Sequence, residues 1–72
     1  MRYAIKHIPT GKFFYEDEGG AFLLDEDESI ITFGKKEKAD ELFNDMKEFS
    51  DDGIIYTEDG DFPIEEFEVY PI

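Results

Sequence analysis

The fold class is decided by the segment KADELFNDMKEF, residues 38–49 of the chain. Its apolar side chains recur at intervals of three and four residues, which places them on one side of an α-helix. These side chains are Ala39, Leu42, Phe43, Met46 and Phe49. We therefore predict an amphipathic helix from near Lys35 to near Phe49, with Gly34 as its N-cap and Gly53 in a left-handed conformation after its end.

The residues before this helix predict strands. Side chains alternate over residues 2–8, and a turn at residues 9–12 leads to a second strand at residues 13–15, so that the two strands form a hairpin. Two further short strands are expected at residues 21–24 and 29–33. The four consecutive acids between them belong in an exposed turn, because unpaired carboxylates are too costly to bury.

The residues after the helix predict a second hairpin. Asp59-Gly60 separates two apolar runs, and an Asp-Gly pair in this setting is a strong hairpin signal. Pro63 has no N–H to donate, so the last strand is expected to begin after it or to lie at a sheet edge. We predict a single small acidic α+β domain, residues 1–72, with an antiparallel sheet of about five strands and the helix packed on one face.

The predicted core combines one face of the helix with the inward-facing residues of the strands. A chain of 72 residues has room for only one such core. The expected members are Tyr3, Ile5, Phe13, Leu24, Ile31, Leu42, Phe43, Met46, Ile55, Phe67 and Val69.

The composition limits the class of protein. The chain has 20 acidic and seven basic residues and a formal net charge of −13, but 40% of its residues are hydrophobic and 17% are aromatic, which favours a folded chain over a disordered one. It contains no cysteine, which excludes disulfides and cysteine-based zinc or redox sites. We find no signal peptide and no apolar segment of about 20 residues, and we therefore expect a soluble, cytoplasmic protein.

No motif in the sequence indicates a reaction. An EF-hand loop starting at Asp25 would need glycine at its sixth position and glutamate at its twelfth, where Ile30 and Lys36 stand instead. His7 is the only histidine, and we expect its ring to be satisfied by local hydrogen bonds. We therefore expect no catalytic residue, no metal site, no cofactor and no enzymatic activity.

Three lysines, Lys35, Lys36 and Lys38, stand at the predicted helix N-terminus, where the helix dipole disfavours cations. One interpretation is simple solvation with an i, i+4 ion pair from Lys36 to Asp40. A second is that the lysines relieve the acidic turn at residues 25–28. A third, contact with a phosphate or nucleic acid, is disfavoured by the surrounding negative charge.

The distribution of charge points to a basic protein as the partner. Residues 15–34 and 48–72 contain no lysine or arginine, so the surface should repel a nucleic acid and attract a protein that binds one. Glu66 and Glu68, two apart on one strand, would stand about 6.6 to 6.8 Å apart, which is about twice the roughly 3.4 Å of helix axis per phosphate along one DNA strand, so the charge spacings are of the same order. The candidate partner-binding residues are Glu16, Asp17, Glu18, Asp25, Glu26, Asp27, Glu28, Asp59, Asp61, Glu66 and Glu68.

We accordingly predict an acidic module that inhibits a protein by occupying its basic, nucleic-acid-binding surface through charge mimicry. Three alternatives stay open: an acidic surface that serves only solubility, a homo-oligomeric structural protein, and a small enzyme or ligand-binder with a concave pocket. The oligomeric interpretation assigns the contact to exposed aromatic residues such as Phe14, Phe22, Tyr56 or Tyr70. No contact with a membrane is expected.

Two segments also carry a resemblance. MRYAIKHIPTGKFFY, residues 1–15, and FGKKEKADELFNDM, residues 33–46, are similar to the short early-region proteins of T-even-like tailed phages. Some proteins of that group inhibit host or defence proteins, and the acidic composition resembles that of phage inhibitors that mimic DNA. The resemblance implies a host-directed inhibitor acting in the host cytoplasm, and it assigns no functional residue.

Overall fold

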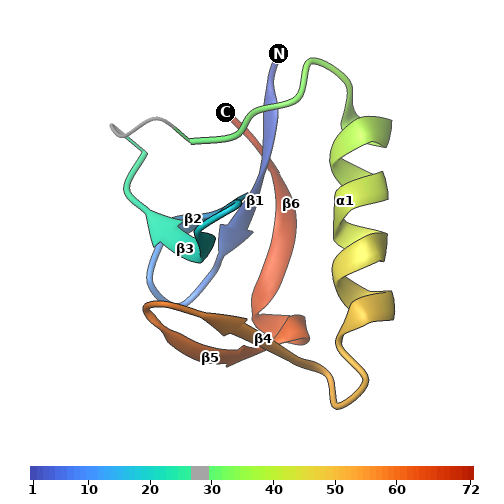
Figure 1. Cartoon of the computed structure of the whole chain (residues 1–72). Coiled ribbons are helices and arrows are strands. Elements are labelled where there is room, and N and C mark those ends of the chain that lie inside the picture. The colour runs from blue at the N-terminus through green and yellow to red at the C-terminus, as the bar shows by residue number, and fades with distance from the viewer. Residues whose placement is uncertain (27–29) are drawn as a thin grey trace.

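The computed structural model describes residues 1–26 and 30–72 of the chain. This part confirms the α+β class, with one α-helix, a four-stranded antiparallel sheet and a separate two-stranded sheet (Figure 1). A short 3₁₀ helix, η1, precedes the last strand. In chain order the elements are β1 (Tyr3–His7), β2 (Lys12–Asp17), β3 (Gly20–Leu24), α1 (Lys36–Phe49), β4 (Ile54–Thr57), β5 (Gly60–Pro63), η1 (Ile64–Glu66) and β6 (Phe67–Pro71).

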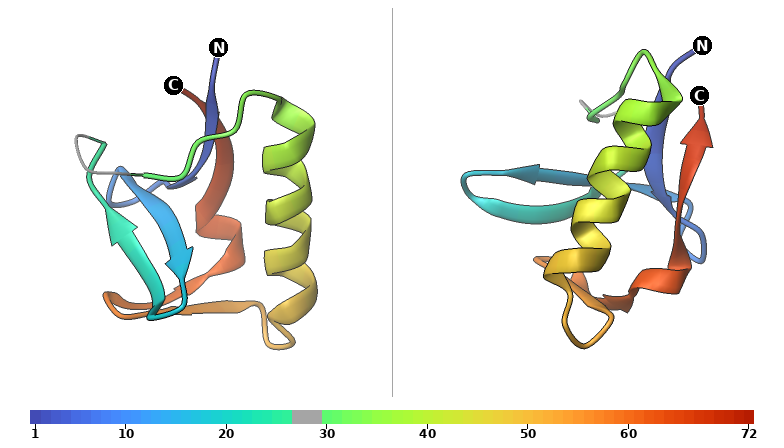
Figure 2. Two further views of the ribbon diagram at one scale, coloured as in Figure 1. Left: turned by 45° about the horizontal axis from the view of Figure 1, so that its top comes forward. Right: turned by 90° about the vertical axis from the view of Figure 1, so that its right-hand side faces the viewer.

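The larger sheet joins the two ends of the chain. Its strand order is β3-β2-β1-β6, and β1 pairs with β6 in a register that sets Ile5 opposite Val69. In the right-hand view of Figure 2, the β2–β3 hairpin runs across the direction of β1 and β6, because the sheet is strongly twisted. Strands β4 and β5 form the second hairpin, which the Asp59-Gly60 pair predicted.

The core lies where α1, the larger sheet and the β4–β5 hairpin meet. Its buried cluster consists of Ile5, Phe14, Leu23, Met46, Ile55 and Phe67. Four of these six were predicted, and Leu42, Phe43 and Val69 pack against the cluster while partly exposed. The prediction chose Phe13 and Leu24 for the core and missed Phe14 and Leu23. Neighbouring residues of a strand point to opposite faces, so alternation selects only one of each pair, whereas Phe13 and Phe14 are both buried.

The strand expected at residues 29–33 is wrong for its described part. Ser29 lies outside the described residues, and residues 30–32 are not in a strand. Phe33 alone forms a bridge, with two 2.8 Å backbone hydrogen bonds to Tyr3. In the described residues, β2 pairs only with Lys6 and His7 of β1. The backbone groups of Tyr3 on that side of β1 are therefore open, and Phe33 binds them as a single residue.

The helix agrees with its prediction except at its ends. Its N-cap is Lys35 and not Gly34, and Lys36 pairs with Asp40 at 3.1 Å as the first interpretation of the lysines expected. Gly53 has the expected positive φ of +74°. Phe49, which the periodicity assigned to the apolar face, is 86% exposed because the last turn extends past the core. Among the described residues, no helix is long and apolar enough to span a membrane.

Candidate functional site

The turn between β4 and β5 covers the outer edge of β3. The backbone N–H of Glu58 donates to the carbonyl oxygen of Ala21 at 2.8 Å, and the N–H of Leu23 donates to a carboxylate oxygen of Asp59 at 2.7 Å. These two groups of β3 face outward, so the turn supplies the partners that a fifth strand would have supplied. The physical reason why the larger sheet has four strands is therefore that this turn ends it.

This contact brings two acidic turns together that are about 40 residues apart in the sequence. The side chain of Glu58 lies against the backbone of Gly20, so close that a Cβ atom built on this glycine would be 3.2 Å from a carboxylate oxygen. The turn between β2 and β3 therefore lies beside the turn between β4 and β5 (Figure 1). We call the exposed acids in these two turns and at the adjoining ends of β2 and β5 the acidic ridge: Glu16, Asp17, Glu18, Glu58, Asp59 and Asp61.

The other predicted acids do not join the ridge. Asp25 and Glu26 follow the opposite end of β3, about 17 Å away for a strand of five residues. Asp27 and Glu28 lie outside the described residues. Glu68 belongs to β6, the far edge of the sheet, where it stands opposite Lys6.

Glu66 contacts His7, the single histidine, in a largely buried cluster. Its carboxylate is 2.9 Å from Nε2 of His7, and the hydroxyl of Thr10 is 2.8 Å from Nδ1. The ring is 1% exposed and packs against Phe62 and Phe67, with ring centroids 4.3 and 4.8 Å away. The expectation of a satisfied ring is confirmed, although one partner lies 59 residues away.

The three side chains of this cluster are of the types found in nucleophile–base–acid triads. Their arrangement is that of a structural link, because the imidazole is enclosed beneath two phenylalanine rings and offers no face to a substrate. The link ties the turn after β1 to η1, and the N–H of Ile8 adds a 2.8 Å bond to the carbonyl of Glu66. Among the described residues, no group of three or more His, Cys, Asp or Glu side chains is arranged to hold a metal ion.

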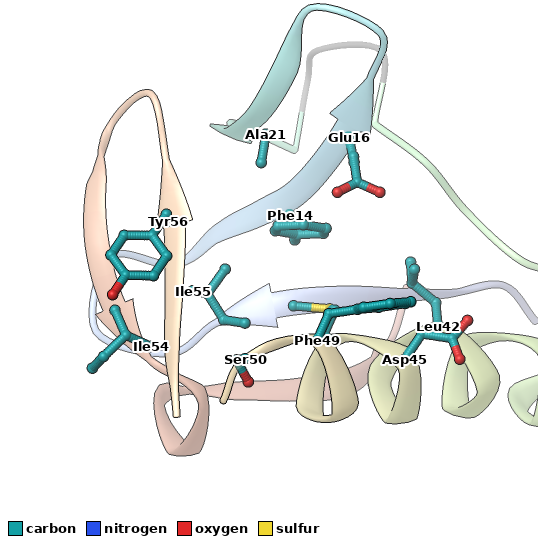
Figure 3. A pocket seen from close by; sticks show the side chains of 11 residues that line it. Phe14, Glu16, Ala21, Leu42, Asp45, Phe49, Ser50, Ile54, Ile55 and Tyr56 are labelled. Atoms are coloured by element: carbon teal, nitrogen blue, oxygen red, sulfur yellow. The ribbon is translucent and has the colours of Figure 1, made fainter. Parts of the chain in front are cut away.

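A groove of about 280 Å³ opens between the C-terminal half of α1, the β2–β3 hairpin and β4 (Figure 3). Its walls are mostly apolar. Phe14 and Ala21 line it from the hairpin, Leu42 and Met46 from the helix, and Ile55 from β4. Phe14, Met46 and Ile55 are also core residues, so the bottom of the groove is the exposed boundary of the hydrophobic core.

The rim of the groove is aromatic and acidic. Phe49 and Tyr56 lie along it with 86% and 60% of their surface exposed. Glu16 of β2 points toward the helix, and Asp45 stands on the helix across from it (Figure 3). Because Glu16 is also part of the acidic ridge, the ridge and the groove are continuous.

Tyr56 is held in place by an acid of the connection between α1 and β4. Its hydroxyl donates to Asp52, whose other carboxylate oxygen accepts the N–H of Ile54 at 3.0 Å. The bond from Tyr56 is the main reason why the pKa of Asp52 lies below its ordinary value of 3.8. The same bond raises the pKa of Tyr56 above 10.0.

Sequence reasoning missed the groove for two reasons. It assigned Phe49 to the apolar side of the helix and offered Phe14 as an exposed contact for oligomerisation, whereas Phe49 is 86% exposed and Phe14, which is 4% exposed, cannot serve that role. The sequence did contain a sign of this exposure. Phe49 is the last residue of the helix, directly before the C-cap Ser50, and the ends of helices fray.

Comparisons of the chain with protein-family models, with curated proteins and with solved structures find no match.

Proposed function

We propose that the protein is an acidic binding module that inhibits another protein by occupying its basic, nucleic-acid-binding surface. The observation that carries the proposal is the docking of the β4–β5 turn on β3, which sets side by side two distant segments that together carry six exposed acids. A solvated acidic coat would need no such gathering. Neighbouring carboxylates add their negative potentials, which attract a cationic surface and accelerate association.

Two carboxylates of the ridge are fixed by the backbone. Asp17 accepts the N–H of Gly19 at 2.8 Å, and Asp59 accepts the N–H of Leu23 at 2.7 Å. In the described part of the chain, no ridge acid forms a salt bridge with a lysine or arginine. The ridge is thus partly preorganised and its charge is uncompensated, and both properties favour binding to a cationic groove.

The mimicry part of the proposal is supported by charge and by the resemblance to phage early-region proteins. A basic surface that binds a phosphate backbone has arginine and lysine side chains that a row of carboxylates can also satisfy. The partner is accordingly expected in the compartment where nucleic acid is handled, the cytoplasm of a bacterial host. The protein acts by occupancy and performs no chemistry.

The test is affinity capture with a variant that neutralises the ridge. The variant carries Glu16→Gln, Glu18→Gln, Glu58→Gln and Asp61→Asn, and it keeps Asp17 and Asp59 because their carboxylates hold the backbone. Proteins retained from a bacterial lysate by the wild type at low salt, and not by the variant, are then purified. We expect the wild type to inhibit their binding to DNA or RNA in a titration, with a steep loss of inhibition as salt is added.

A matched control neutralises four acids away from the ridge: Glu37→Gln, Glu41→Gln, Glu48→Gln and Glu68→Gln. These residues are exposed on α1 or β6. We expect this control to retain capture and inhibition. Equal loss of binding in both variants would show that net charge alone is responsible, and captured proteins that keep their nucleic-acid binding in the presence of the wild type would refute mimicry.

A further inference from the structure

We infer that the groove between α1, the β2–β3 hairpin and β4 receives one large apolar side chain from the partner, carried by a segment in which lysine or arginine flanks it. This inference rests on the proposed function, because it describes how the same basic partner is anchored. It adds that charge brings the partner to the ridge and that an apolar anchor then holds it.

The size of the groove suits a single side chain. An apolar cavity of about 150 Å³ accommodates a benzene ring, so a groove of about 280 Å³ accommodates a phenylalanine, leucine or methionine side chain with room at its open mouth. It is smaller than most sites that bury a cofactor or a drug-sized ligand. The inner wall is preformed, since Phe14, Met46 and Ile55 are held in the core.

The exposed aromatic rings at the rim mark an interface. A phenylalanine with 86% of its surface in water has almost none of the stabilisation that burial would provide. Phe49 of α1 and Tyr56 of β4 both lie on the rim of an apolar groove, and exposed apolar surface of this kind marks sites of protein–protein contact. Tyrosine and phenylalanine are also residue types enriched in such contacts.

Charge complementarity identifies the occupant as basic. Glu16 and Asp45 stand on opposite walls of the groove, and within the described residues neither carboxylate forms a salt bridge. A segment with cationic residues on both sides of an apolar anchor satisfies both walls at once. A second copy of this chain is a poorer occupant, because it carries the same charge of −13 and would be repelled.

The test uses three synthetic peptides and the ¹⁵N-labelled full chain. The first peptide is Gly-Lys-Lys-Gly-Phe-Gly-Lys-Lys-Gly, the second replaces Phe with Ser, and the third keeps Phe and replaces each Lys with Ser. We expect the first peptide to bind about tenfold or more tightly than the second, and to shift the amide signals of Phe49, Ser50, Ile55 and Tyr56. The third is expected to bind at least tenfold more weakly than the first at low salt.

Two variants assign the difference to the groove. Phe49→Ala should remove most of the advantage of the first peptide over the second, whereas Ile8→Ala, which removes another exposed apolar side chain away from the groove, should keep it. Added salt should weaken the first and second peptides alike and leave their ratio unchanged, since the anchor is uncharged.

The outcomes separate this inference from the proposed function. Equal binding of the first and second peptides, with shifts confined to the acidic turns, overturns the groove anchor and leaves the proposed function standing. Failure of both lysine peptides to bind removes the proposed function and the anchor together. Equal binding of the first and third peptides, or a dimer seen by light scattering that Phe49→Ala converts to a monomer, shows that the groove takes an occupant of other chemistry.

Discussion

The cluster around His7 and the groove beside Phe49 are both built where distant segments meet, but one is closed and the other is open. In the first, Glu66 and Thr10 satisfy both nitrogens of a ring that is 1% exposed. In the second, Glu16 and Asp45 face an apolar space, and the adjacent aromatic ring of Phe49 is 86% exposed.

The comparison separates acids that join segments of the fold from acids that form no such link, and Asp59 of the acidic ridge belongs to the first group. Three acids join segments of the described structure through their carboxylates: Glu66 binds the ring of His7, Asp59 accepts the N–H of Leu23, and Asp52 accepts the hydroxyl of Tyr56. A count of charges does not distinguish these three acids from Glu16 and Asp45 on the rim of the groove. Substitutions in the two sets should therefore differ in their effect on the free energy of unfolding.

The largest effect on stability is expected for His7→Ala. The substitution leaves a cavity beneath Phe62 and Phe67 and removes the partner of Glu66, and we expect it to lower the free energy of unfolding by about 3 kcal/mol. For a domain of this size that corresponds to a fall in Tm of roughly 10 to 20 °C. Thermal and urea unfolding followed by circular dichroism measure it.

Glu66→Gln is the matched control for the His7 cluster. It keeps an oxygen that can accept a hydrogen bond from the imidazole, so we expect a loss of less than about 1 kcal/mol. A His7→Ala protein that melts within about 3 °C of the wild type would show that the cluster contributes little to the fold.

A smaller loss is expected for Asp59→Ala. Without this carboxylate the N–H of Leu23 has no acceptor, which should lower the free energy of unfolding by about 1 to 2 kcal/mol. Hydrogen exchange at the Leu23 amide should also become faster. Asp61→Ala removes the same charge from the same hairpin and should leave that exchange rate unchanged; equal acceleration in both variants would contradict the edge-covering role of Asp59.

Tyr56→Phe tests the link that holds the rim of the groove. Because the pKa of Asp52 is lowered in the folded state, its contribution to stability is present above pH 3.8 and is lost as the pH falls through the folded-state value. Removing the hydroxyl should move this pKa up toward 3.8 and weaken the acid-sensitive contribution. Carboxyl titration by NMR measures the pKa.

Tyr70→Phe is the control for this titration, because its hydroxyl forms no hydrogen bond within the described residues. It should leave the titration of Asp52 as it is in the wild type. An Asp52 titration that is the same in Tyr56→Phe as in the wild type would show that the bond is not formed in solution.

The smallest effect on stability is expected for Phe49→Ala. A side chain that is 86% exposed has few folded-state contacts to lose, so the free energy of unfolding should change by no more than about 0.5 kcal/mol. Urea unfolding measures this change. A loss above about 2 kcal/mol would place Phe49 in the core, as its helical position predicted, and would remove it from the rim of the groove.

Prediction from the sequence succeeded where the signal is local. The helix at Lys36–Phe49 and the hairpin around Asp59-Gly60 follow from spacing and turn residues. The strand expected directly after Pro63 begins only at Phe67, because Ile64–Glu66 form η1 and Pro63 itself ends β5. Prediction failed for the strand expected at residues 29–33, whose described part forms only the bridge between Phe33 and Tyr3, because composition and alternation do not specify which sheet edge a segment pairs with.

The α+β class, the amphipathic helix, the hairpin turns and the net charge of −13 can all be read from the order of the residues. The tertiary structure alone decided that the two acidic turns meet, that Glu66 serves His7 and that a groove opens beside Phe49. The physical reason is one of range. Periodicity and turn chemistry act between residues a few positions apart, whereas each of these features joins residues that only the packing of the sheet and helix brings into contact.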